Sequence, residues 1–184
     1  MINAYRSNGS VTALTPAASL THLPDDIVWI DLIDPSPDED HYVESLLGID
    51  VPTRDELKDI EPSSRLYVEH GSVFMTASLV WRAESNTPRL TDVAFILVND
   101  RLLTVRYADP KSFGLFIAAL GRAPEDNGNG RSLLAHLLET IADRTAEILE
   151  QAIARIDHLS TDIFRDRETR RPPKFLEAKL ADIA

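Results

Sequence analysis

The chain of 184 residues contains no cysteine, and it lacks several other features that define large classes of protein. Without cysteine it has no disulfides, thiolate metal ligands or thiol nucleophiles, which is typical of a reducing compartment. Its seven glycines form neither a GxxxxGK[ST] nor a GxGxxG loop, so nucleotide binding has no support. The longest uncharged apolar runs, Val73–Trp81 and Phe113–Gly121, are about half the ~20 residues of a membrane span. The amino terminus also lacks a signal-peptide layout, so we expect the chain as written to be soluble and cytoplasmic.

Positive charge is scarce as well. Nineteen lysines and arginines oppose thirty acids, which gives a net charge of −11. This balance argues against nucleic acid as a partner, because phosphate binding needs clustered basic residues. It suits high solubility, attraction of cations, or a need for counter-ions when copies assemble. The histidines form neither an HExxH motif nor a catalytic triad order, so we expect them at or near the surface: His22, His41, His70, His136 and His158.

The first two-thirds of the sequence alternates strand and helix patterns. Several strand patterns are joined by short turns, which indicates hairpins; the strands are expected over residues 2–5, 11–14, 28–32, 65–69, 73–81, 90–98 and 102–107. Trp29 and Trp81 lie in strand patterns and are expected in the core. Strand pairs mixed with helices predict an α/β (α+β) fold, in which a mixed sheet is layered with helices.

Two helices are expected to begin at capping boxes. Ser36 precedes Pro37 and Glu39, and Thr53 precedes Glu56 at the same spacing. The first helix should end near Leu47-Gly48 and the second near Ile60. A third should run from Asp109-Pro110 to about Leu120.

A loop at Gly121–Gly130 is the best domain boundary, and everything after it has a helical pattern. We therefore predict a domain over 1–125 and a helical arm over 130–184. An apolar stripe predicts one helix from Ser132 to Phe164, roughly 50 Å long at 1.5 Å per residue. A new helical pattern starts after Pro172-Pro173 and stops unfinished at the end of the sequence, so we expect a piece of a longer protein.

The densest group of acids is a candidate for a metal site: Asp31, Asp34, Asp38, Glu39 and Asp40. Helix capping is the favoured interpretation, because acids in a first turn complement the helix dipole and its free N–H groups. A metal-dependent hydrolase that uses Asp31, Asp34 and Asp38 is a further reading. No histidine or nucleophile joins these acids, so the chain is predicted not to be an enzyme.

Five segments and the long helix together resemble the cytoplasmic amino-terminal domain of the CorA-type magnesium and cobalt transporters. The matching segments, in order, are WIDLIDP at 29–35, LGI at 47–49, PTRDELKDIE at 52–61, SRLY at 64–67, FILVNDRLLTVR at 95–106 and the helix at 133–163. The resemblance covers essentially the whole chain. It implies a three-layer α/β/α sandwich with a mixed sheet, followed by long antiparallel helices.

The resemblance also implies a function. Family members are homopentamers of the bacterial inner membrane, with a cytoplasmic funnel that senses intracellular Mg²⁺ and gates the influx of Mg²⁺ or Co²⁺. Their Gly-Met-Asn pore motif and two carboxy-terminal membrane helices are not in this sequence, so transport would belong to a part outside it. The expected partners are copies of the chain and divalent cations, and contact with the membrane would be made only through the missing helices. Without those helices, the 184 residues would be a monomer or a dimer.

A regulatory cation site follows from the same resemblance. In the family, an acid in the short helix after the Leu-Gly element binds a regulatory divalent cation against an acid on a neighbour's stalk helix. In this chain we expect the cation to be Mg²⁺, bound weakly in the millimolar range. Alignment through Leu47-Gly48 places Glu56 there, with Asp55 and Asp59 nearby. Glu56 also fits the capping box after Thr53, and both roles stay open. The neighbour's acid would lie beyond Ala184.

The acid balance of the long helix suggests how the cation would act. Acids outnumber basic residues six to two over 132–163: Glu139, Asp143, Glu147, Glu150, Asp157 and Asp162 against Arg144 and Arg155. Crowding such helices around one axis costs repulsion, which Mg²⁺ relieves. The alternative reading is a stand-alone helical protein-interaction module that uses the apolar stripe and senses no ion.

Overall fold

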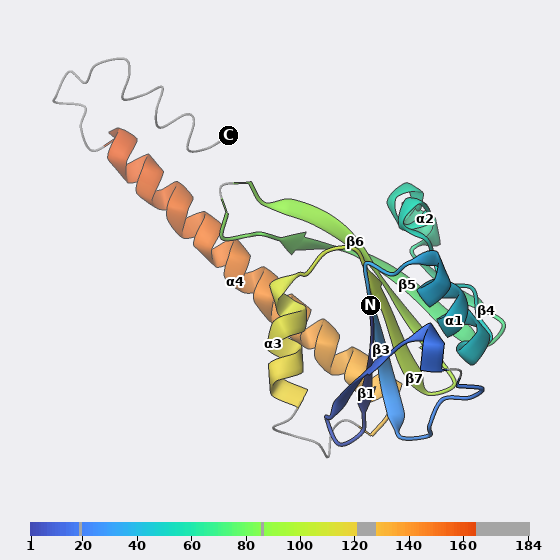
Figure 1. The fold of residues 1–184 in the computed structure, drawn as a ribbon. Helices are drawn as coiled ribbons and strands as arrows, with labels where there is room; N and C mark the ends of the chain where they lie inside the picture. Colours follow the sequence, from blue (N-terminus) through green and yellow to red (C-terminus); the bar gives the residue numbers. More distant parts are fainter. Residues whose placement is uncertain (19, 86, 121–127, 165–184) are drawn as a thin grey trace. The chain divides into compact units, whose positions relative to one another are not determined.

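Seven strands form one mixed sheet in the computed structural model, which describes residues 1–18, 20–85, 87–120 and 128–164 (Figure 1). The strands are β1 (Ile2–Arg6), β2 (Val11–Leu14), β3 (Ile27–Ile33), β4 (Leu66–Glu69), β5 (Ser72–Trp81), β6 (Arg89–Val98) and β7 (Arg101–Arg106). Their order across the sheet is β2-β1-β3-β7-β6-β5-β4. Neighbours are antiparallel except for β3 and β7, which run parallel. The predicted strands are confirmed, with ends that differ by a residue or so.

The helices begin within two residues of the positions that the sequence predicts. They are α1 (Pro37–Leu47), α2 (Arg54–Asp59), α3 (Lys111–Leu120) and α4 (Gly130–Phe164). Both capping boxes are formed, by Ser36 with Glu39 and by Thr53 with Glu56. Most of the predicted loop before α4 and the whole pattern after Pro172-Pro173 lie outside the described residues.

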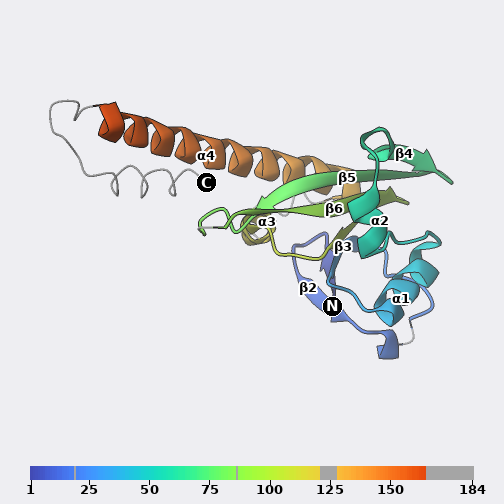
Figure 2. The same ribbon diagram turned by 90° about the horizontal axis from the view of Figure 1, so that it is seen from above.

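Helices cover both faces of the sheet (Figures 1 and 2). On one face, α1 and α2 pack through Val43, Leu47 and Leu57 against strand residues such as Ile96. On the other face, α3 and the beginning of α4 pack around Trp29; the residues that they contribute are Phe113, Phe116, Leu120, Leu133, Leu134 and Leu137. The predicted α+β fold with helices on both sides of a mixed sheet is confirmed.

A buried ion pair joins the two parallel strands. Asp31 on β3 and Arg106 on β7 are both almost completely buried, and Arg106 Nη2 donates to Asp31 Oδ2 at 2.9 Å. The carboxylate also accepts a hydrogen bond from Thr104 Oγ1 at 2.7 Å, and the Trp29 indole N–H donates to that same hydroxyl at 2.9 Å. The Arg106 guanidinium lies over the ring of Phe113 in α3, 4.5 Å from its centroid. This network links β3, β7 and α3.

Asp31 and Trp81 differ from the expectations that the sequence gives for them. The sequence places Asp31 among acids expected to cap a helix, but Asp31 lies in β3 and pairs with Arg106. Asp38, Glu39 and Asp40 do occupy the first turn of α1, as expected for capping. Trp29 is fully buried, but Trp81 is only half-buried, with the Arg82 guanidinium 4.3 Å from its ring centroid.

The chain divides into two compact units, Met1–Ala142 and Asp143–Ala184. The first contains the sheet, α1 to α3 and the beginning of α4; the described part of the second is the rest of α4. The predicted boundary between 1–125 and 130–184 therefore stays a prediction about domains. No helix within the described residues is both long and apolar enough to cross a membrane.

We predict that Arg106→Met destabilises the fold by about 3–5 kcal/mol, because it leaves the Asp31 carboxylate buried without its cation. The free energy of unfolding in urea measures this loss. Lys111→Met is the matched control: it removes the cation that pairs with Glu84 at the surface and should cost less than about 1 kcal/mol. Equal, small losses in the two variants would contradict a central role for the buried pair.

Candidate functional site

The predicted regulatory residues lie on the short helix α2, which Thr53 caps. The Glu56 Oε2 atom accepts hydrogen bonds from both the backbone N–H and the hydroxyl of Thr53, each at 2.8 Å. In return, the Glu56 backbone N–H donates to Thr53 Oγ1 at 3.4 Å. These bonds to Thr53 favour the charged carboxylate and lower the pKa of Glu56. The capping role that the sequence left open for Glu56 is therefore present in the structure.

The second oxygen of the same carboxylate is not used by the cap. Glu56 is exposed, and within the described residues no hydrogen bond or ion pair reaches its Oε1. Asp55 is also exposed and pairs with Lys58, whose Nζ lies 3.2 Å from Asp55 Oδ1. Asp59, the last residue of α2, is exposed too. The capping bonds leave one Glu56 oxygen open to solvent.

The three acids do not by themselves make a metal centre. Within the described residues, no group of three or more His, Asp or Glu side chains is placed to hold a metal ion. A hard cation such as Mg²⁺ is commonly held by one or two carboxylates and several waters. The described residues thus offer such an ion fewer than three grouped ligands, and the assignment of Glu56, Asp55 and Asp59 stays a prediction.

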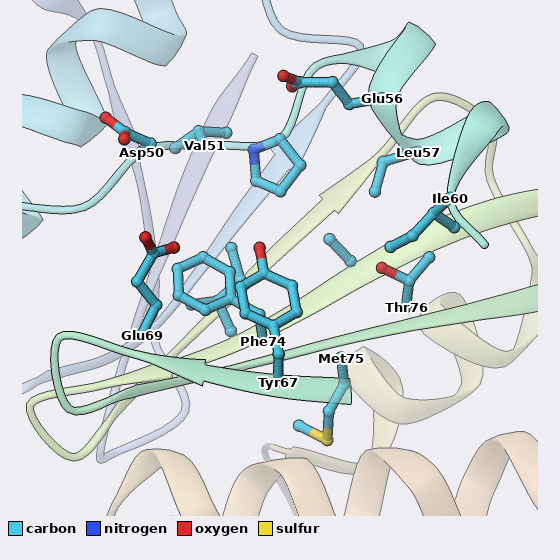
Figure 3. Close-up of a pocket in the computed structure, with 13 residues that line it drawn as sticks. Asp50, Val51, Glu56, Leu57, Ile60, Tyr67, Glu69, Phe74, Met75 and Thr76 are labelled. Atoms are coloured by element: carbon cyan, nitrogen blue, oxygen red, sulfur yellow. The ribbon is translucent and has the colours of Figure 1, made fainter. Parts of the chain in front are cut away.

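A pocket of about 280 Å³ lies beside α2, between this helix and strands β4 to β6 (Figure 3). Its floor is apolar and includes Leu57, Phe74 and Ile96. Three carboxylates line it: Asp50, Glu56 and Glu69. The pocket exists because α2 has six residues and buries only Leu57, so it covers only part of the sheet face.

Strand β4 supplies one wall of this pocket. The ring of Tyr67 stacks on Phe74 of β5, with centroids 4.8 Å apart and planes 2° from parallel. Burial, and then the charges of Glu69 and Glu56, raise the pKa of the Tyr67 hydroxyl. The sequence does not reveal the pocket, because its residues come from four separate segments: 50–60, 67–69, 74–76 and 94–96. The one signal for it in the sequence is the expected hairpin of β4 and β5, which brings two of these segments together.

The other side of α2 is basic. A second pocket, of about 210 Å³, is lined by Arg54, Lys58 and Arg89, with Asp92 as its one acid. The Arg54 guanidinium lies 5.5 Å from the ring centroid of Tyr107. Helix α2 therefore separates an acidic pocket from a basic one.

The residues suggested for a hydrolase do not come together. Asp31 is buried in its ion pair, whereas Asp34 and Asp38 are exposed. The histidines are exposed or half-buried, as expected, and His41 bonds through its ring to the Pro37 carbonyl at 2.7 Å. Within the described residues, Asp31, Asp34 and Asp38 therefore do not form a group that could hold a metal ion.

The chain is similar to known magnesium transport proteins of the CorA type. A family model described as "CorA-like Mg2+ transporter protein" matches residues 24–174. The "Magnesium transport protein CorA" of Salmonella typhimurium is 31% identical over 144 residues, which are 78% of this chain and 45% of the relative. The protein of the same name from Wolinella succinogenes is 27% identical over 147 residues, 78% of this chain and 46% of the relative. The chain thus spans about half the length of these curated relatives.

The fold has a solved counterpart as well. The complete structure of the CorA magnesium transporter from Methanocaldococcus jannaschii matches with a TM-score of 0.67 at 17% identity, covering 98% of this chain and 55% of that chain. At this identity the match concerns the fold alone. It agrees with the mixed sheet and the helices on its two faces.

The lowered pKa of Glu56 predicts a pH-dependent capping effect. Its ionised form is favoured by folding, so its stabilisation is present above the ordinary value of 4.5 and is lost as the pH falls through the lower folded-state pKa. Glu56→Gln should therefore destabilise the chain by about 0.5–1 kcal/mol at pH 7 and by less at pH 3. Urea unfolding of both proteins at the two pH values measures the difference.

A Thr53→Ala background provides the control. It removes the hydroxyl that donates to Glu56 Oε2, so Glu56→Gln should cost less there than in the unaltered chain. An effect of the same size at both pH values and in both backgrounds would contradict the capping role.

Proposed function

The chain belongs to the CorA-like Mg²⁺ transporter family, and on this premise we propose that it is the cytoplasmic regulatory domain of a divalent-cation transporter. The transported ion would be Mg²⁺ or Co²⁺, and the domain would sense intracellular Mg²⁺ and gate its influx. Its place would be the cytoplasmic face of the bacterial inner membrane. The observation that carries this proposal is the Glu56 carboxylate, which caps α2 with one oxygen and leaves the other exposed.

The cation would be shared between copies of the chain. Glu56, with Asp55 and Asp59 nearby, supplies at most a partial set of oxygen ligands. An acid from a neighbouring copy would complete the set, which fits a homopentamer. Because exposed carboxylates bind Mg²⁺ weakly and largely through water, the site would respond in the millimolar range.

Repulsion between the α4 helices of different copies would link cation binding to the closure of the assembly. The acids of α4 exceed its basic residues, and one of those basic residues, Arg144, is already paired with Glu147. Several such helices around one axis repel one another unless cations lie between them. High Mg²⁺ would then favour a closed assembly, and depletion would loosen it. A coupling of about 1–3 kcal/mol is enough, since it shifts a population 5- to 150-fold.

A second candidate is a helical interaction module that senses no ion. Within α4, Leu149, Ile153 and Ile156 are about 60% exposed and form an apolar stripe. Such a stripe suits a partner helix as well as a second copy. Two apolar runs of about 20 residues encoded downstream of residue 184 would favour the transporter, and their absence would favour the module.

We predict that millimolar Mg²⁺ protects the complete, membrane-inserted protein from limited proteolysis, because the closed assembly hides cleavable segments. The variant Glu56→Gln/Asp55→Asn/Asp59→Asn should require several-fold more Mg²⁺ for the same protection. The cleavage rate, measured over a Mg²⁺ series, gives the midpoint for each protein.

Thr53→Ala is the matched control, because it weakens the α2 cap but keeps all three carboxylates. Its Mg²⁺ midpoint should equal that of the unaltered protein. If Mg²⁺ changed neither the cleavage rate nor the packing of the subunits, the regulatory proposal would fail.

A further inference from the structure

We propose that the pocket beside α2 is a binding site for a small primary alkylammonium ion. Its ammonium head would lie among the carboxylates that line the pocket, and its short alkyl body would cover the apolar floor. This inference concerns the pocket itself and does not rest on the proposed role in Mg²⁺ sensing.

The interior of the pocket is apolar and suits an alkyl group. Val51, Leu57, Phe74, Ala94 and Ile96 line it, and all five are buried residues of the core on the α1–α2 face. They leave a space of about 280 Å³, close to the lower end of the range for ligand pockets. An apolar surface of this kind gains free energy when an alkyl group displaces water from it.

The charged groups in the lining are all carboxylates, which favours a cationic ligand. Asp50, Glu56 and Glu69 line the pocket, and no lysine, arginine or histidine does. Asp50 has no ion-pair partner among the described residues, and Glu69 pairs only with the exposed His70, at 3.9 Å. The lining of the pocket is thus negatively charged, and Figure 3 shows the carboxylates of Asp50, Glu56 and Glu69 at separate places around its apolar floor.

An alkylammonium ion matches both the apolar floor and the carboxylates of the pocket. Its head has three hydrogen-bond donors and no acceptor, so neighbouring carboxylates and the Tyr67 hydroxyl can share it. A bare metal ion would leave the floor uncovered. The described residues also hold no three-ligand metal group. The apolar floor therefore favours an organic cation inside the pocket.

Nuclear magnetic resonance titration of the 184-residue chain tests this assignment, with n-pentylamine, n-propylamine and ammonium chloride as probes at pH 7. We expect saturable shifts at the amides of Thr76 and Ala94, which line the pocket. Affinity should rise by about fourfold for each buried methylene group. Ammonium chloride, which has no alkyl body, should bind most weakly.

Asp50→Asn/Glu69→Gln should weaken n-pentylamine binding by about tenfold, because two charges near the head are lost. Glu139→Gln/Glu150→Gln is the matched control: it removes two exposed acids from α4 and should leave the affinity unchanged. All four side chains are exposed, and urea unfolding checks that each variant is folded.

The assignment would be overturned by affinity that is independent of alkyl length, by shifts spread over exposed acids without saturation, or by equal losses in the two double variants. Each of these results would indicate general attraction of cations to an acidic protein. Loss of Mg²⁺ protection with intact amine binding would instead count against the regulatory proposal alone.

Discussion

The buried pair of Asp31 and Arg106 is the constraint on which the rest of the structure depends. Desolvating two charges is costly, and further contacts offset the cost: the carboxylate accepts a hydrogen bond from Thr104, and the guanidinium donates to Asp109 and lies over Phe113. The pair holds β3 against β7, the parallel neighbours at the centre of the sheet. The chain between these strands forms α1, α2 and the β4–β6 meander. A shift between β3 and β7 would therefore move every wall of the pocket beside α2 relative to the remaining sheet.

Local chemistry was readable from the sequence, whereas long-range pairing was not. Two capping boxes and the Asn99-Asp100 turn placed helix and hairpin boundaries, because each depends on residues a few positions apart. Asp31 was misassigned because its partner lies 75 positions away. Trp81 resembled a core residue by strand pattern, but it ends β5, where it is only half-buried. The family resemblance points to Glu56, but only the folded structure shows that one of its oxygens caps α2 while the side chain stays exposed.

Helix α2, with six residues, carries the proposed cation ligands and borders two pockets. One side lines the acidic pocket and the other lines the basic one, and Leu57 borders both. Its cap depends on the same carboxylate that is proposed to meet a cation. A ligand on Glu56 would consequently act on the first turn of α2. The pocket on one side of this helix is lined by acids, and the pocket on the other side is lined mainly by basic residues. A ligand bound to Glu56 would therefore change the stability of the α2 cap.

Strand β4 has a consequence for how the protein behaves in solution. It lies at one end of the sheet, and within the described residues no strand pairs with its outer side. Leu66 and Val68 are about two-thirds exposed on one face of this strand. Free backbone groups next to apolar side chains are a template for aggregation, while the charge of Glu69 at the end of the strand opposes it. Conditions that neutralise glutamate or screen charge should thus make concentrated samples precipitate by edge-to-edge stacking before the core unfolds.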